Sequence, residues 1–177
     1  MKSSEHPKNI KDYPEEHHGI VRIKRLPREL TIISTMAEWH YHQWGQRNKA
    51  AGSINQLITG FWAQADSKQI PMTFVAMAGD ELLGFASLIA HDIDARQDLS
   101  PCLANVYVTP SHRNTGVGSA LVNKAVEQAE KLKVKKLYLF TPDKENFYLQ
   151  LGWTTQEHIV LRDEKVAVMA ISTNHRT

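Results

Sequence analysis

The sequence predicts a mixed α/β fold, with a mostly antiparallel central sheet of about seven strands, one parallel strand pair, and flanking helices. The apolar period alternates several times between that of helices and that of strands, and Gly and Pro residues stand at the changes. A strand–helix–strand unit of about 40 residues, over 103–140, has the form of a right-handed crossover. Its two strands are therefore expected to be parallel neighbours.

The first third of the chain predicts one strand and two helices. Residues 20–26 alternate apolar with basic side chains, which predicts a half-buried strand that ends at Pro27. Apolar residues at steps of three and four then predict a helix from Leu30 that stops near Gly45. A second helix is expected over 53–65, with Ser53 as its N-cap. Its expected apolar face consists of Ile54, Leu57, Ile58, Phe61 and Trp62.

The remainder predicts strands around one long helix. A hairpin turns at Gly79 and Asp80, and a polar loop over 92–101 precedes a strand that stops at Pro110. A short helix is expected to end at Gly152. The expected ranges are strands over 72–78, 81–91, 103–108, 136–140, 155–161 and 166–171, and helices over 117–132 and 144–151.

The composition is that of one ordinary domain. The 177 residues are 42% apolar, and 21 Lys and Arg against 19 Asp and Glu leave a net charge of +2, which generates no field suited to nucleic acid. The longest apolar run, over 82–90, is far shorter than the ~20 residues of a membrane span. The single Cys102 forms no internal disulfide. We expect a cytoplasmic protein with a flexible extension over 1–18 and one domain over 19–173.

A glycine-bearing loop lies between the strand over 103–108 and the long helix, where backbone N–H groups converge on an anion. Gly116 and Gly118 allow close approach, Arg113 adds positive charge, and Thr115 and Ser119 offer hydroxyl donors. No Asp or Glu occurs over 99–126. This pattern predicts a pyrophosphate site. The alternative is that the two glycines only form a tight turn, and the spacings of the P-loop and of the dinucleotide-binding fingerprint are not met.

Two motifs resemble the GNAT N-acetyltransferase superfamily, namely Leu103-Ala-Asn-Val-Tyr-Val-Thr-Pro-Ser-His-Arg-Asn-Thr-Gly-Val-Gly-Ser-Ala-Leu121 and Phe147-Tyr-Leu-Gln-Leu-Gly-Trp153. The resemblance covers about 82–160, is weaker over 20–65 and is absent from the first 18 residues. It implies the GNAT fold with acetyl-CoA as cosubstrate, whose pantetheine arm adds to the strand where the parallel pair splays apart. The cofactor-binding residues that it implies are Val106, Tyr107, Val108, Arg113, Asn114, Thr115, Gly116, Val117, Gly118 and Ser119.

The resemblance also implies a reaction. An acetyl group is transferred to a primary amine, which attacks directly in a ternary complex. The backbone N–H of Val106 or Tyr107 is expected to stabilise the oxyanion. Tyr148 occupies the family's usual general-acid position. Because a phenol of pKa ~10 is a weaker acid than a thiol of pKa ~8.5, a hydrogen bond to the departing thiolate is its expected role. Helical spacing directs Phe147 and Leu151 inward and Tyr148 toward the sulfur. The alternative makes Tyr148 a wall of the site or part of the core.

The proton acceptor is not evident from the sequence. Many family members place a Glu on the strand before the loop, but no carboxylate occurs over 103–108. We expect water-mediated deprotonation through Asn105, Tyr107 or a group of the first helices. Trp39 and Trp44 are expected either to wall the acceptor pocket or to be core aromatics. His40 and His42 point about 200° apart on a helix, so no metal site is expected.

Two other function classes are compatible with the sequence. The first is a non-catalytic module of the same fold that binds or senses acyl-CoA, and it would not need the Tyr148 face. The second is a nucleic-acid-binding regulator, for which the basic run over 131–136 lacks interleaved aromatic residues. We expect no nucleic-acid or membrane partner. The acceptor is a small molecule or a peptide, and exposed edge strands are compatible with a monomer or a homodimer.

Overall fold

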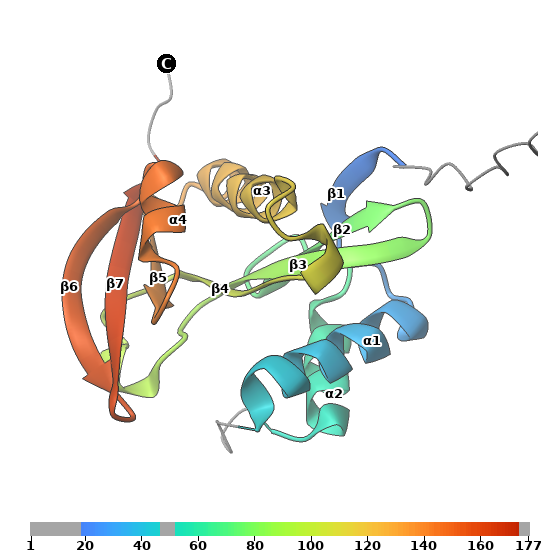
Figure 1. Cartoon of the computed structure of the whole chain (residues 1–177), viewed down its shortest axis with the longest axis horizontal. Helices are drawn as coiled ribbons and strands as arrows, with labels where there is room; N and C mark the ends of the chain where they lie inside the picture. Colours follow the sequence, from blue (N-terminus) through green and yellow to red (C-terminus); the bar gives the residue numbers. More distant parts are fainter. Residues whose placement is uncertain (1–18, 47–51, 174–177) are drawn as a thin grey trace, which may run out of the picture.

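The computed structural model describes residues 19–46 and 52–173, and the extension predicted over 1–18 lies outside these residues. Helices cover both faces of a central sheet (Figure 1). The strands are β1 (Val21–Arg25), β2 (Met72–Ala78), β3 (Glu81–Ile89), β4 (Cys102–Val108), β5 (Lys136–Thr141), β6 (Thr154–Leu161) and β7 (Glu164–Ser172). The helices are α1 (Leu30–His40), the π-helix η1 (Tyr41–Gly45), α2 (Ile54–Gln64), the 3₁₀ turns η3 (Asp94–Arg96) and η4 (Pro110–His112), α3 (Val117–Lys131) and α4 (Glu145–Gln150).

The seven strands form one mixed sheet in the order β1-β2-β3-β4-β5-β7-β6. Every neighbouring pair is antiparallel except β4 and β5. The predicted fold class, including its single parallel step, is therefore confirmed. None of the helices in the described part of the chain has the length and apolar composition of a membrane span.

The parallel pair is very short. Only Cys102 and Tyr138 are paired across it, and the Tyr138 N–H donates to the Pro101 carbonyl at 3.1 Å. From Leu103 onward β4 remains bonded to β3 but has no pairing with β5. The strands diverge because β4 continues beside β3 while β5 continues beside β7 (Figure 1). One edge of β4 is consequently left open inside the sheet.

Side-chain alternation along β2 separates two apolar layers. Phe74 and Ala76 face α3, whereas Val75 and Met77 face α1 and α2 on the opposite side of the sheet. Figure 1 shows α3 on one face and the α1/α2 pair on the other. The apolar residues of α3 that are buried against the sheet are Val117, Leu121, Val122, Ala125 and Ala129.

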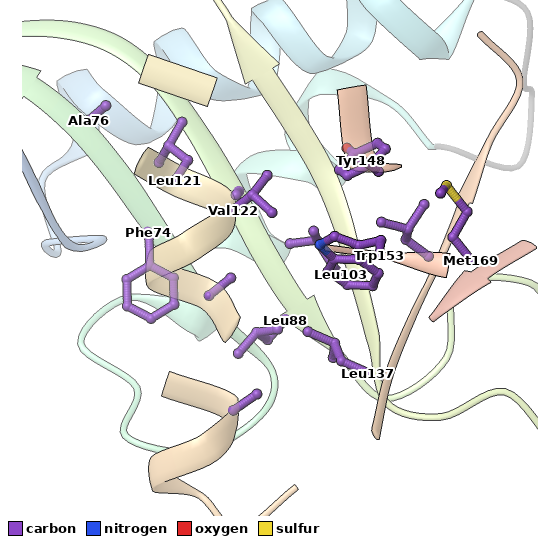
Figure 2. Close-up of a cluster of buried hydrophobic side chains, with 14 of the residues drawn as sticks. Phe74, Ala76, Leu88, Leu103, Leu121, Val122, Leu137, Tyr148, Trp153 and Met169 are labelled. Atoms are coloured by element: carbon purple, nitrogen blue, oxygen red, sulfur yellow. The ribbon is translucent and has the colours of Figure 1, made fainter. Parts of the chain in front are cut away.

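The α3 layer continues beneath the C-terminal strands, as Figure 2 shows. Trp153, only 1% exposed, is its largest fully buried side chain and lies in one cluster with Leu103, Leu137 and Met169. The backbone N–H of Trp153 donates to the backbone carbonyl of Tyr148 at 3.1 Å. This bond connects α4 to the residue before β6. Because so short a helix is not stable alone, its packing against the core stabilises it.

Two local expectations were wrong. Strand β1 is mostly exposed, with only Ile23 half-buried, because it is an edge strand that pairs with β2 alone. Trp62 is 39% exposed rather than part of the apolar face of α2, and the Arg28 guanidinium lies over its ring at 5.6 Å. The helix predicted from Leu30 to near Gly45 is confirmed, and its last turn is the π-helix η1.

Gly84 marks the tightest contact between β3 and β4. A Cβ atom built there would collide with the backbone carbonyl oxygen of Tyr107 and lie 3.2 Å from the Cα of Val108. Neither atom can move without displacing β4. Gly84 is therefore required by the close approach of two backbones, not by its own φ angle.

We predict that Gly84→Ala destabilises the fold by about 1–3 kcal/mol, because the added methyl forces a backbone shift in β4. Urea unfolding measures the loss. Gly60→Ala in α2 is the matched control, since a Cβ there meets nothing within 4 Å, and it should be neutral or slightly stabilising. Equal stability of both variants would contradict the proposed contact.

Candidate active site

A β-bulge interrupts β4 next to the point where it leaves β5. Asn105 and Val106 together lie opposite the single residue Ala86 of β3. Asn105 adopts the left-handed conformation, with φ of +55°. Asn tolerates this conformation better than other residues with a Cβ atom. One residue of β4 is thus left out of the ladder, at the position where the sequence analysis expects the oxyanion donor.

Hydrogen bonds hold the Asn105 side chain on both sides. Its Oδ1 lies 3.0 Å from His40 Nε2, and its Nδ2 donates to Ser87 Oγ at 3.3 Å. The chain continues from Ser87 Oγ to Thr73 Oγ1 at 2.7 Å, and the Thr73 hydroxyl donates to Gln64 Oε1 at 2.7 Å. This "polar chain" (His40, Asn105, Ser87, Thr73 and Gln64) runs through the α1/α2 side of three strands. It joins both helices to the bulge.

His40 is a buried polar residue at the α1 end of the polar chain. It is 9% exposed, and its Nδ1 is buried with no hydrogen-bond partner among the described residues. Burial lowers the pKa of His40, and the hydrogen bond with Asn105 opposes this only in part. The imidazole is therefore neutral at pH 7. Sequence reasoning missed this role, although His40 follows Ile33 and Ala37 on the buried face of α1.

A pocket of about 140 Å³ opens beside His40 on the α1/α2 side of the sheet. It brings together a neutral imidazole, three side-chain amides and an apolar wall. Among residues 19–46 and 52–173, no carboxylate, ammonium or guanidinium group lines it. The lining residues are His40, Gln56, Leu57, Gly60, Phe61, Gln64 and Asn105.

Tyr107 is the centre of an aromatic group on the same side of β4. Its ring stacks on Phe85, with centroids 5.4 Å apart. Trp39 lies 5.5 Å and Trp44 6.3 Å from the ring. Both tryptophans are half-buried and pack against the core, but neither lines the 140 Å³ pocket. The structure thus gathers the two predicted acceptor-site aromatics around Tyr107.

The glycine-bearing loop leads from β4 into α3. Gly116 is the N-cap of α3 with φ of +91°, so this backbone favours glycine. The next three N–H groups, of Val117, Gly118 and Ser119, have no acceptor one turn earlier in the helix. Gly118 is helical, and a Cβ there would make only ordinary contacts, at 3.5 Å with Phe147 and 3.6 Å with Val108. The free protein therefore has room for a side chain at Gly118.

The other predicted loop residues surround these N–H groups. The Arg113 Nε donates to the Val108 carbonyl at 3.0 Å, and the guanidinium lies over the Tyr107 ring at 5.7 Å. The Thr115 hydroxyl is engaged within the loop, because it donates to the His112 carbonyl at 2.5 Å. Asn114 is exposed with φ of +60°. The side chains of Val106 and Val108 pack on the α3 side of β4.

Tyr148 is placed differently from the sequence expectation. It is the buried residue of α4, 7% exposed, whereas Phe147 and Leu151 are only half-buried. The chain turns back after Gly152 and brings Trp153 to 6.0 Å from the Tyr148 ring, with Phe147 at 4.9 Å (Figure 2). Burial and then the charge of Asp143 raise the pKa of Tyr148. Its hydroxyl forms no hydrogen bond with a described residue.

The structure brings the predicted cofactor residues into one continuous segment from the bulge of β4 to the first turn of α3. His40 and His42, as expected, do not converge, since His40 is buried and His42 is exposed. Within residues 19–46 and 52–173, no group of three or more His, Cys, Asp or Glu side chains is placed to hold a metal ion.

Solved structures with the same fold are acetyltransferases. An aminoglycoside 6'-N-acetyltransferase complexed with coenzyme A superposes with a TM-score of 0.71 at 16% identity, covering 88% of this chain and 99% of that chain. A putative acetyltransferase from Salmonella typhimurium with acetyl-CoA gives 0.66 at 15% identity, covering 89% and 96%. A spermidine/spermine N-acetyltransferase from Vibrio cholerae gives 0.62 at 18% identity, covering 86% and 92%.

Sequence comparison points to the same family. No curated protein matches this chain at a significant level. The sequence model of the acetyltransferase (GNAT) domain matches residues 70–155, which contain β2 to β5, the glycine-bearing loop, α3 and α4. Residues 70–155 are therefore a GNAT acetyltransferase domain.

Proposed function

We propose that this protein is an acetyl-CoA-dependent N-acetyltransferase, which transfers the acetyl group to a primary amine by direct attack in a ternary complex. The observation that carries the proposal is the open edge of β4, followed within a few residues by the unbonded N–H groups that begin α3. Residues 19–173 would act as one domain, because a single sheet runs from Val21 to Ser172.

The open edge and the loop fit the two parts of the cosubstrate. The amides of the pantetheine arm can pair with β4 at Val106, Tyr107 and Val108, where β5 has diverged. The pyrophosphate then lies over the loop, on the N–H groups of residues 114–119 and near Arg113. The absence of Asp and Glu over 99–126 leaves this segment free of charge repulsion.

The bulge supplies the position for the oxyanion donor. In our proposal the N–H of Val106, or that of Tyr107, donates to the carbonyl oxygen as it acquires charge. One such donor contributes about 3–4 kcal/mol to transition-state stabilisation. The polar chain fixes Asn105 and with it the backbone that carries this donor.

Tyr148 is proposed to donate a hydrogen bond to the departing thiolate. Because its pKa is raised by burial, the phenol stays protonated and is a poorer acid than a free tyrosine. This favours a hydrogen bond over complete proton transfer.

The acceptor is proposed to be the amine of a small molecule or a peptide. The solved relatives whose names state an acceptor act on aminoglycosides and on spermidine or spermine, all of which are amines. We further propose a cytoplasmic monomer or homodimer without nucleic-acid or membrane partners. A net charge of +2 supports the absence of a nucleic-acid role.

Free-thiol release from acetyl-CoA with a panel of amines tests the function. We expect thiol release that depends on at least one amine, with the acetylated amine as the second product. Coenzyme A binding without turnover across the panel would instead support the sensing module. Salt-dependent DNA or RNA affinity would support the regulator.

We predict that Gly118→Ala weakens coenzyme A binding about 10- to 100-fold, because the methyl holds the pyrophosphate away from one or two charge-assisted N–H bonds. Isothermal titration calorimetry measures the affinity. The thermal midpoint of the free protein should not fall, since the added Cβ makes only ordinary contacts. Gly60→Ala, in α2, is the control and should bind coenzyme A normally. Unchanged affinity of Gly118→Ala would contradict the proposed pyrophosphate position.

We predict that Tyr148→Phe lowers kcat by about 10- to 100-fold, the value of a hydrogen bond to a charged group. Its unfolding free energy should stay within about 0.5 kcal/mol of the wild type, because the ring is retained. Steady-state thiol release measures kcat, and urea unfolding provides the control. Undiminished turnover would assign Tyr148 to the core alone.

A further inference from the structure

We propose that the pocket of about 140 Å³ on the α1/α2 side of the sheet selects the amine substrate. In this proposal Gln56 and Gln64 of α2 donate hydrogen bonds to a carboxylate or carboxamide oxygen that the substrate carries in addition to its amine. The inference rests on the proposed N-acetyltransferase function and names its substrate class. Its basis is the set of hydrogen-bonding groups that the fold leaves unused in the pocket.

The pocket reaches the strand on which acetyl transfer is proposed to take place. Asn105 contributes to the lining and also belongs to the bulge of β4. The next residue, Val106, carries the N–H that we propose as an oxyanion donor. A substrate whose amine nitrogen attacks at the bulge therefore has the pocket beside it, and the rest of the molecule can extend along α2.

The lining residues of α2 occupy one side of the helix. Gln56, Gly60 and Gln64 follow one another at steps of four, so these positions share a face. At 1.5 Å per residue, the two glutamines are separated by about 12 Å along the helix axis. Leu57 and Phe61 provide the apolar part of the lining. This face of α2 thus carries two amides with apolar surface between them.

The oxygens of both glutamines are already engaged. Gln56 Oε1 accepts from the backbone N–H of Ser53 at 2.8 Å, as part of the capping box that begins α2. Gln64 Oε1 accepts from the Thr73 hydroxyl at 2.7 Å. None of the described residues accepts a hydrogen bond from the Nε2 of either glutamine. Each glutamine therefore retains an amide NH₂ group with unused hydrogens.

These amide donors are accessible to a bound molecule. Gln56 is exposed and Gln64 is half-buried. In the part of the chain that the structure describes, the side-chain nitrogens that are both buried and without a partner are His40 Nδ1 and Trp153 Nε1. Gln64 Nε2 has no partner either and is not one of them, so it retains accessible surface. Asn105, by contrast, is bonded through both ends of its amide.

Amide donors recognise oxygen atoms rather than ammonium groups. A carboxylate or carboxamide oxygen offers lone pairs to the two NH₂ groups, whereas an ammonium has three donors and no lone pair. A second ammonium in this pocket would lose hydration without gaining a hydrogen bond from either amide. The pocket therefore favours amines that carry a carboxylate or carboxamide over polyamines such as spermidine, which the name of one structural neighbour states as its substrate.

Three amines with the same number of carbons test this selectivity. 5-Aminopentanoate, pentylamine and cadaverine end in a carboxylate, a methyl group and an ammonium. We expect kcat/KM to fall in that order, by about 3- to 30-fold per step, the factor of a partly exposed hydrogen bond to a charged group. The difference should appear in KM, because an end group remote from the reacting carbonyl contributes uniform binding. A kcat/KM for cadaverine, corrected for its two equivalent amines, that equals or exceeds that of 5-aminopentanoate would overturn the selectivity.

Gln56→Glu replaces the donor by an acceptor and retains the cap. Glutamate is the other usual partner in a capping box, and its charge is favourable in the first turn of a helix. We expect the ratio of kcat/KM for 5-aminopentanoate to that for cadaverine to fall about tenfold or more, because the new carboxylate repels one end group and attracts the other. Urea unfolding should show a stability equal to or above that of the wild type.

Asn55→Asp is the matched control for the added charge. Asn55 precedes Gln56 in the same turn, is exposed and does not belong to the pocket lining. The substitution leaves both amide donors in place. The ratio should change by less than about threefold, since water and salt screen an exposed charge outside the pocket. A shift of the same size in both variants would indicate a general effect of charge and would overturn the role of Gln56.

Binding without turnover separates this inference from the proposed function. Calorimetric titration of 5-aminopentanoate and of cadaverine into the protein saturated with coenzyme A measures their affinities directly, and we expect 5-aminopentanoate to bind more tightly. That result in a protein that acetylates no amine would overturn the function and support the selectivity. Thiol release that is as fast with diamines as with amines carrying a carboxylate or carboxamide would overturn the selectivity and support the function.

Discussion

The separation of β4 from β5 is the constraint on which the rest of the site depends. A parallel pair usually continues for several residues, but here a single residue pair joins the two strands. The unpaired edge of β4 would be costly if it stayed dry and unbonded. The pantetheine pairing that we propose would satisfy it, and β3 holds the opposite edge in register up to Val108. The fold thus leaves one edge of β4 unpaired in the middle of its sheet.

The two helical layers make different kinds of contact with β4 and its neighbours. On one side α3 anchors the apolar core through Leu121 and Val122 and presents its first turn to the loop. On the other side α1 and α2 contribute His40 and Gln64 to hydrogen bonds that end on the bulge. Asn105 is where these contributions meet, because its backbone forms the bulge and its side chain receives the bond from α1.

Most of the fold was predictable because its signals are local. The apolar period of α3, the Gly79 turn of the hairpin and the stop after β4 are each contained within a few residues. The loop motif, from which the cofactor segment is proposed, is equally local. The exposure of β1 and Trp62 was not predictable, since it depends on which neighbours cover them. The orientation of Tyr148 depends on the return of Trp153, which helical spacing alone does not contain.

The polar chain around His40 lay beyond sequence reasoning for a further reason. Its five members come from α1, α2, β2, β3 and β4, and each is an ordinary residue in its own segment. Only the hydrogen-bond directions make them a unit. Four hydrogen bonds in series connect Gln64 to His40, so a substitution at either residue leaves a neighbour in the polar chain without a partner. Among relatives of this chain, the identities at positions 40, 64, 73, 87 and 105 should be inherited as one group, although 65 residues separate the first position from the last.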